Sequence, residues 1–150
     1  MLKGIPNIIS PDLLKVLHEM GHGDEIVLAD GNFPGASMAK AGDGGKKAIF
    51  LRADGHGVCE LLKAILKIFP LDTYAQPVYI MEKVEGDTVA TPIWGEFDEI
   101  LKDHTDEAVE KLERYAFYER SKKAYCILQT GESAQYANII LKKGVVVDGE

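Results

Sequence analysis

Short runs of apolar residues alternate with segments of helical periodicity along this chain, and that alternation constrains the fold more than any other feature. Buried strands are expected at residues 25–29, 48–51, 78–81, 125–130 and 138–141. Amphipathic helices are expected at residues 11–20, 58–69 and 96–104. Strands separated by helices are typical of a layered α/β fold. We therefore expect a single α/β/α domain spanning residues 1–150, with a largely parallel central sheet.

The first helix has the clearest boundaries. Ser10 is a typical N-cap, Pro11 suits the first helical position, and Gly21 is a natural stop. The next residue is His22, so His18-Glu19-Met20-Gly21-His22 matches the H-E-x-x-H zinc-protease pattern. That chemistry needs both histidines on one continuous helix. We expect the helix to stop before His22 and therefore expect no metal site here.

Two segments have weaker signals. Residues 31–47 are rich in Gly, Ala and Lys without periodicity, which predicts a long loop. Residues 107–123 have helical propensity throughout, yet 109–113 could instead form a strand that leads into a helix at 115–123.

Charge and cysteine content exclude several classes of protein. The 17 basic and 24 acidic residues give a net charge of −7, which disfavours nucleic acid and anionic membrane surfaces as partners. Two cysteines, Cys59 and Cys126, are too few for a disulfide framework and are expected as buried free thiols. Residues 1–6 do not resemble a secretory signal, and no apolar stretch is long enough to span a bilayer. We expect a soluble cytoplasmic protein.

His22 and Asp30 are the first candidates for chemistry. His22 lies in a Gly-His-Gly-Asp turn that would leave its imidazole exposed, although it could equally cap the preceding helix. Asp30 follows a predicted strand at its carboxyl end, where α/β sheets place ligand-binding groups, although it could equally start a turn. A histidine and a carboxylate in one crevice would suit proton transfer on a polar substrate.

Further motifs follow in order along the chain. They are Met20–Glu25, Asp30 with Phe33–Pro34, Leu51–Gly55, Tyr118–Arg120, Thr130–Glu132 and Tyr136–Val145. This set resembles the ribose pyranase and fucose mutarotase family over residues 9–145. Arg114 before an aromatic helix is similar to the fucose branch, whereas ribose-type members tend to carry histidine there.

The resemblance implies an isomerase that interconverts the α and β anomers of a free monosaccharide, L-fucose, by acid–base ring opening and closure without a cofactor. It implies that His22 donates a proton, with Tyr118 or Tyr136 as a candidate proton partner. It assigns contacts with sugar hydroxyls to Asp30, Arg114, Tyr136, Ala137 and Asn138. It also implies a ring-like homo-oligomer with sites near subunit interfaces.

Two other functions remain open at this point. A ribose-type pyranase would interconvert pyranose and furanose forms by similar chemistry. A non-catalytic monosaccharide-binding module would keep the pocket without the proton transfer.

Overall fold

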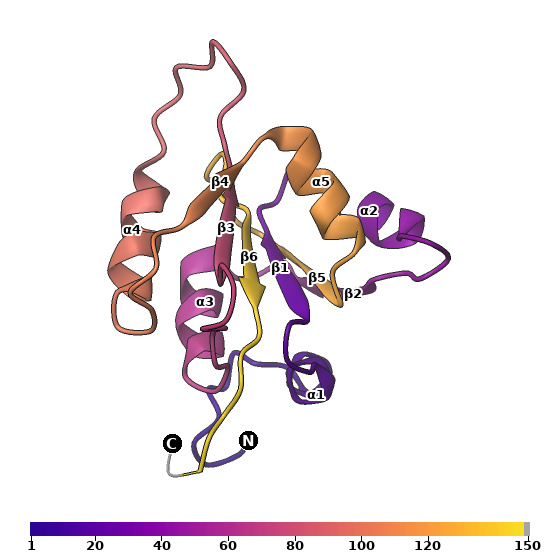
Figure 1. Cartoon of the computed structure of the whole chain (residues 1–150), viewed down its shortest axis with the longest axis vertical. Helices are drawn as coiled ribbons and strands as arrows, with labels where there is room; N and C mark the ends of the chain where they lie inside the picture. Colours follow the sequence, from indigo (N-terminus) through magenta and orange to yellow (C-terminus); the bar gives the residue numbers. More distant parts are fainter. Residues whose placement is uncertain (149–150) are drawn as a thin grey trace.

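A six-stranded sheet forms the centre of the structure, a computed structural model that describes residues 1–148 (Figure 1). Its strands are β1 (Glu25–Ala29), β2 (Ile49–Ala53), β3 (Val78–Met81), β4 (Glu110–Leu112), β5 (Cys126–Thr130) and β6 (Ile139–Lys142). They lie in the order β2-β5-β1-β6-β3-β4, and β6 alone runs antiparallel to its neighbours among these described strands. The largely parallel sheet expected from the sequence is confirmed.

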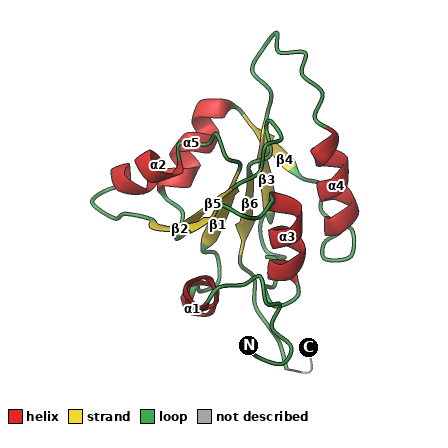
Figure 2. Cartoon of the chain, turned by 180° about the vertical axis from the view of Figure 1, so that it is seen from behind, coloured by secondary structure: helices red, strands yellow, loops and turns green. Residues whose placement is uncertain are grey.

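Helices cover both faces of this sheet (Figure 2). The helices are α1 (Pro11–Glu19), α2 (Gly35–Ala41), α3 (Val58–Leu66), α4 (Pro92–Leu101) and α5 (Arg114–Lys122). Residues of α1, α3 and α4 pack in one core with side chains from one face of the sheet, and residues of α2 and α5 pack in a second core on the other face. Because β1 is buried from both sides, its sequence is an almost continuous apolar run. The α/β/α layering is confirmed.

Helix α1 begins and ends where the sequence predicts. Ser10 Oγ accepts a hydrogen bond from the Leu13 N–H at 3.1 Å, and Pro11 follows the cap. Leu13, Val16 and Leu17 are buried against the sheet. The helix ends at Glu19, before His22 as expected, so His18 and His22 do not share a helical face.

The predicted loop at residues 31–47 contains a helix, α2, so that prediction is wrong in part. Helix α2 lacks apolar periodicity because it packs closely against β5 through small residues, with Gly35 and Ala39 buried. A Cβ atom at Gly35 would overlap the side-chain oxygen of Gln129 and lie 3.0 Å from the Phe50 ring. Residues 42–47 then form a turn that leads into β2.

The helix predicted at 96–104 begins four residues earlier, at Pro92, a proline suited to the first helical turn. In the ambiguous segment 107–123 the strand-then-helix alternative is correct, because β4 pairs with β3 and α5 follows. The carboxylate of Glu113 caps α5 by accepting hydrogen bonds from the N–H groups of Tyr115 and Ala116.

Both cysteines are free thiols, and only Cys126 is fully buried. Burial raises the pKa of Cys59 to about 11 and that of Cys126 to about 12. Within residues 1–148 none of the helices combines the length and the apolar character needed to cross a membrane.

Candidate active site

His22 lies in the turn between α1 and β1 and is held by a buried carboxylate. Its Nε2 is 3.0 Å from Oδ1 of Asp72, a side chain that is 3% exposed, whereas the His22 side chain is 44% exposed. A carboxylate only accepts hydrogen bonds, so Nε2 carries the proton in this contact and Nδ1 is directed away from Asp72. The Tyr74 ring lies beside the imidazole, with 5.1 Å between the ring centroids. His22 is therefore both oriented and accessible.

Asp72 is itself fixed by its surroundings. Its Oδ1 also accepts the Tyr74 N–H at 3.0 Å, and its own N–H donates to the Lys142 carbonyl at 3.0 Å. Burial favours the neutral acid, but the hydrogen bonds from the Tyr74 N–H and from His22 outweigh that effect and lower the pKa of Asp72. An ionised Asp72 stabilises a protonated His22. Asp72 could not be identified from the sequence, because its contact with His22 joins residues 50 positions apart.

Asp30 directly follows β1 and is almost fully buried, at 4% exposure. Its Oδ1 accepts the Asn32 N–H at 3.0 Å, and its Oδ2 accepts the Ala137 N–H at 3.2 Å. The Asp30 N–H donates to Asn138 Oδ1 at 2.8 Å. Burial raises the pKa of Asp30, and these N–H donors offset that rise only in part. Asp30 thus starts a turn, as one reading of the sequence allowed, and also anchors residues 136–138.

Tyr136 has a backbone φ of 55°, a left-handed conformation that is uncommon for a residue other than glycine. The Trp94 indole N–H donates to its carbonyl at 2.8 Å. The Tyr136 hydroxyl donates to Asp87 Oδ2 at 2.6 Å and accepts the Val84 N–H at 3.2 Å. The hydrogen bond to Asp87 raises the pKa of Tyr136. These contacts fix a partly buried phenol beside the buried Ala137 and Asn138.

Arg114 begins α5 on the same side of the fold. Its Nε donates to the Tyr118 hydroxyl at 2.9 Å, and its guanidinium lies 5.4 Å from the centre of the Tyr118 ring. Arg114 also acts electrostatically on Tyr136, which opposes the rise in the pKa of that phenol. Arg114, Tyr118 and Tyr136 therefore form one polar cluster with the Asp30 anchor. We call the residues Asp30, Arg114, Tyr118, Tyr136, Ala137 and Asn138 the hydroxyl cluster.

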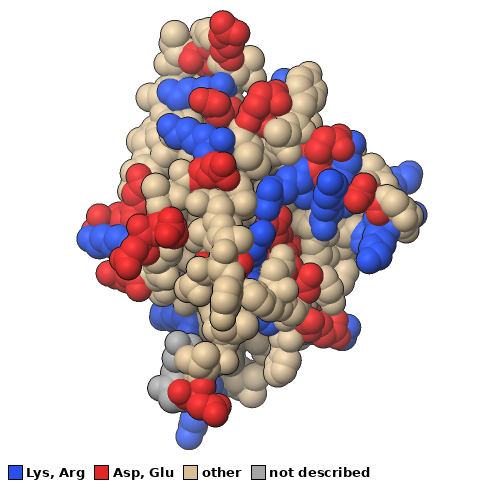
Figure 3. All heavy atoms as spheres, viewed as in Figure 1, with Lys and Arg blue, Asp and Glu red and all other residues tan. Residues whose placement is uncertain are grey.

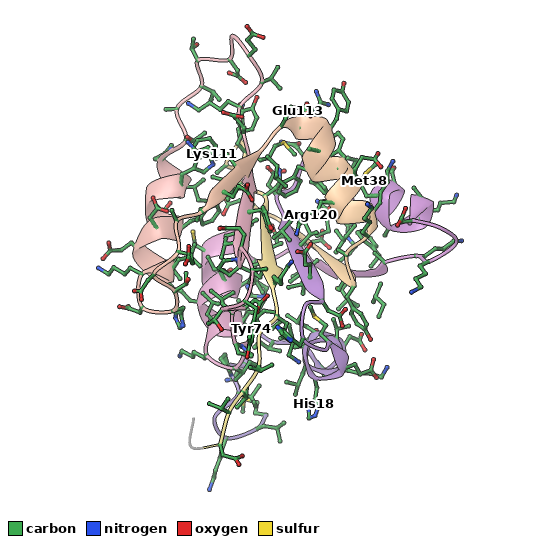
Figure 4. The ribbon with its side chains drawn as sticks, viewed as in Figure 1. His18, Met38, Tyr74, Lys111, Glu113 and Arg120 are labelled. Atoms are coloured by element: carbon green, nitrogen blue, oxygen red, sulfur yellow. The ribbon has the colours of Figure 1, made fainter. Side chains whose placement is uncertain are left out.

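The hydroxyl cluster and His22 lie at opposite ends of the sheet within one chain. His22 precedes β1 and Asp30 follows it, and a five-residue strand such as β1 spans about 17 Å. Figure 4 shows the same separation, with Tyr74 at one end of the sheet and Glu113, next to Arg114, at the other. The expectation that His22 and Asp30 share one crevice is wrong for a single chain. It overlooked that the two residues flank the same strand.

Over residues 1–148 no group of three or more His, Cys, Asp or Glu side chains is arranged to hold a metal ion. The sequence analysis did not identify Asp72, which holds His22 at one end of the sheet. It also did not identify Asp87, which accepts the hydrogen bond of the Tyr136 hydroxyl at the other end.

Comparison with known proteins places this geometry in a family. Residues 3–146 match the model of the RbsD / FucU transport protein family. A fucose mutarotase of Danio rerio is 50% identical over 97% of this chain and 95% of its own length. The chain belongs to the RbsD / FucU family.

Solved structures agree with this assignment. FucU from Bifidobacterium longum is 59% identical with a TM-score of 0.90, and the match covers 97% of this chain and 100% of that one. The fucose mutarotase of Streptococcus pneumoniae, solved in complex with L-fucose, is 51% identical with a TM-score of 0.88 over the same shares of both chains.

Proposed function

We propose that this protein is an L-fucose mutarotase, an isomerase that exchanges the α and β anomers of the free sugar. The observation that carries the proposal is the exposed imidazole of His22 held by the buried carboxylate of Asp72. The identity of 50% with a fucose mutarotase over nearly the whole chain supports the choice of substrate.

The proposed reaction needs only proton transfers. Protonated His22 donates a proton through Nδ1 to the ring oxygen, while a base removes the proton of the anomeric hydroxyl. The C1–O bond to the ring oxygen breaks and the open-chain aldehyde forms. The carbonyl group turns, the hydroxyl adds to its other face, and the two protons return. The Asp72 carboxylate stabilises the imidazolium before it donates its proton and again after the proton returns, and Tyr118 or Tyr136 is the candidate for the other proton transfer.

The proposed binding groups are those of the hydroxyl cluster. Arg114 can donate two parallel hydrogen bonds to neighbouring sugar oxygens. The Tyr136 phenol and the Asn138 amide offer further polar atoms. Asp30 belongs to the proposed site because its carboxylate and N–H anchor Ala137 and Asn138, and the Ala137 backbone shapes the same surface.

We propose that a complete site forms only between two copies of the chain. His22 of one copy would meet the hydroxyl cluster of the next, because the two groups cannot converge within one chain. A repeated head-to-tail contact of this kind closes into a ring. On the face in Figure 3 acidic side chains gather over α4, and basic side chains lie among acidic ones over α2 and α5.

The proposed partner is a free monosaccharide, and neither nucleic acid nor a membrane surface is a proposed partner. The proposed location is the cytoplasm, where the free thiols Cys59 and Cys126 would stay reduced.

Saturation-transfer NMR on L-fucose tests the proposed function. We expect the wild-type protein to accelerate exchange between the anomers and the His22→Ala variant to lose that acceleration. His18→Ala is the matched control, because His18 is exposed on α1 and should not affect exchange. Wild-type exchange no faster than that of His22→Ala would contradict the proposal. Faster exchange on D-ribose than on L-fucose would instead favour a ribose-type pyranase, and sugar binding without exchange would favour a binding module.

A further inference from the structure

Lys143 attaches the segment that follows His22 to the sheet. It comes directly after β6, and its backbone extends the antiparallel pairing of β6 with β1. The Gly23 N–H donates to the Lys143 carbonyl at 2.8 Å, and the Lys143 N–H donates to the Asp24 carbonyl at 2.8 Å. These two bonds fix the chain immediately after His22.

The side chain of Lys143 holds the segment that precedes His22. Its Nζ donates to the Leu17 carbonyl at 2.8 Å and to the Met20 carbonyl. Helix α1 ends at Glu19, so these carbonyls belong to a helix end whose last acceptors lack partners inside the helix. A cation at this end also interacts favourably with the helix dipole.

Lys143 acts on the backbone of the turn, whereas Asp72 acts on the ring of His22. Burial lowers the pKa of the Lys143 ammonium, and the nearby Asp24 carboxylate acts in the opposite direction. Asp24 also accepts the Gly21 N–H at 2.7 Å, which closes the turn on itself. One lysine therefore bridges the end of α1, the His22 turn and the end of β6.

We propose that Lys143 is a positioning residue for the proton transfers of His22, an inference that rests on the proposed function. The Lys143 side chain holds the flank before His22 and its backbone holds the flank after it. Loss of the ammonium would release the first flank and let the imidazole move relative to the sugar. A misplacement of about 1 Å can slow an enzymatic step by about 100-fold. We assign Lys143 no part in binding sugar hydroxyls, because its Nζ donates to the Leu17 and Met20 carbonyls.

Kinetics of three variants test the proposal. Lys143→Met keeps the apolar stem and removes the ammonium, and we expect kcat for anomer exchange to fall at least about tenfold while KM for L-fucose changes less than about twofold. Lys143→Arg keeps the charge and the donors and should recover most of the loss. Lys142→Met is the matched control, because the Lys142 ammonium lies 3.6 Å from a Glu25 carboxylate oxygen, whereas the Lys143 ammonium binds the carbonyls that precede His22.

An NMR readout separates positioning from simple loss of stability. We expect Lys143→Met, and not Lys142→Met, to shift the imidazole resonances of His22 and to speed amide exchange at Gly23. If Lys143→Met does not fold, Lys143→Gln, which keeps a neutral donor, is measured by the same criteria.

The proposal is overturned if kcat stays within about twofold of wild type, if Lys142→Met loses as much activity, or if the His22 resonances do not move. If the wild-type protein itself fails to exchange L-fucose anomers, the proposed function fails. The NMR readout then still decides whether Lys143 fixes the turn.

Discussion

Replacing Asp72 by asparagine removes one negative charge from beside His22 and changes little else in volume. Both hydrogen bonds that Asp72 accepts from His22 and from the Tyr74 N–H use the same oxygen, Oδ1. The asparagine carbonyl oxygen can accept both bonds, so the positions of His22 and Tyr74 should be preserved. The change therefore isolates the charge that stabilises a protonated imidazole.

The expected change in rate follows from the difference in strength between a hydrogen bond to a charged group and one between neutral groups. A bond to a charged group contributes about 1.5–3 kcal/mol and a neutral one about 0.5–1.5 kcal/mol, so the difference is about 1–1.5 kcal/mol. Because the His22 side chain is 44% exposed, solvent screening favours the lower end, about 1 kcal/mol. When the neutral imidazole predominates, a proton-donating form of His22 that is less stable by about 1 kcal/mol is about fivefold less populated, and the rate falls by about the same factor.

The assay is anomer exchange of L-fucose by saturation-transfer NMR, with kcat measured at saturating sugar. We expect Asp72→Asn to show a kcat about fivefold lower than wild type and an unchanged KM. Asp103→Asn, an exposed aspartate after α4, is the control and should match wild type. An Asp72→Asn variant with wild-type kcat would refute the role assigned to the carboxylate. A loss of 100-fold or more would show that Asp72 does more than stabilise charge.

Three further predictions concern the fold around the site. Ser10→Ala removes the cap bond to Leu13 and should lower the free energy of unfolding by about 1 kcal/mol, measured by urea denaturation. Gly35→Ala should cost about 1–3 kcal/mol in the same assay, because the new Cβ would displace the buried Gln129 side chain; a stabilised variant would contradict the packing of α2. Because the folded-state pKa of Asp72 lies below its ordinary value of 3.8, its contribution to stability is present above that pH and is lost as the pH falls through the folded-state pKa. The difference in the free energy of unfolding between wild type and Asp72→Asn should therefore become smaller as the pH falls from 6 to 2. A difference that becomes larger at acidic pH would contradict this expectation.

The parts of the fold that could be predicted from the sequence are those governed by local chemistry and burial. Strand β1 was predicted at its observed limits because a strand buried on both faces is a continuous apolar run. The start of α1 followed from the side-chain cap at Ser10. Helix α2 was missed because close packing through Gly35 and Ala39 replaces the apolar stripe that periodicity detects.

The residues of the candidate site were predicted from the sequence, but their arrangement in space was not. His22, Asp30 and Arg114 were identified from their motifs. The strand predicted at residues 25–29 already separates His22 from Asp30, and the expectation of one shared crevice overlooked this. Asp72 and Lys143 could not be found, because each acts through contacts with residues far away in the sequence. Their positions depend on β6 lying beside β1, which only the folded sheet determines.

Complementation between two inactive variants tests most directly whether His22 of one copy works with the hydroxyl cluster of another. The measurement is anomer exchange of L-fucose by oligomers that contain His22→Ala and Arg114→Ala subunits in equal amounts, refolded or expressed together. Each variant alone should show little exchange. If every site takes His22 from one subunit and Arg114 from its neighbour, about one site in four is intact in a random mixture, and about a quarter of wild-type exchange should return. A mixture no more active than the average of the two separate variants would contradict a site shared between copies.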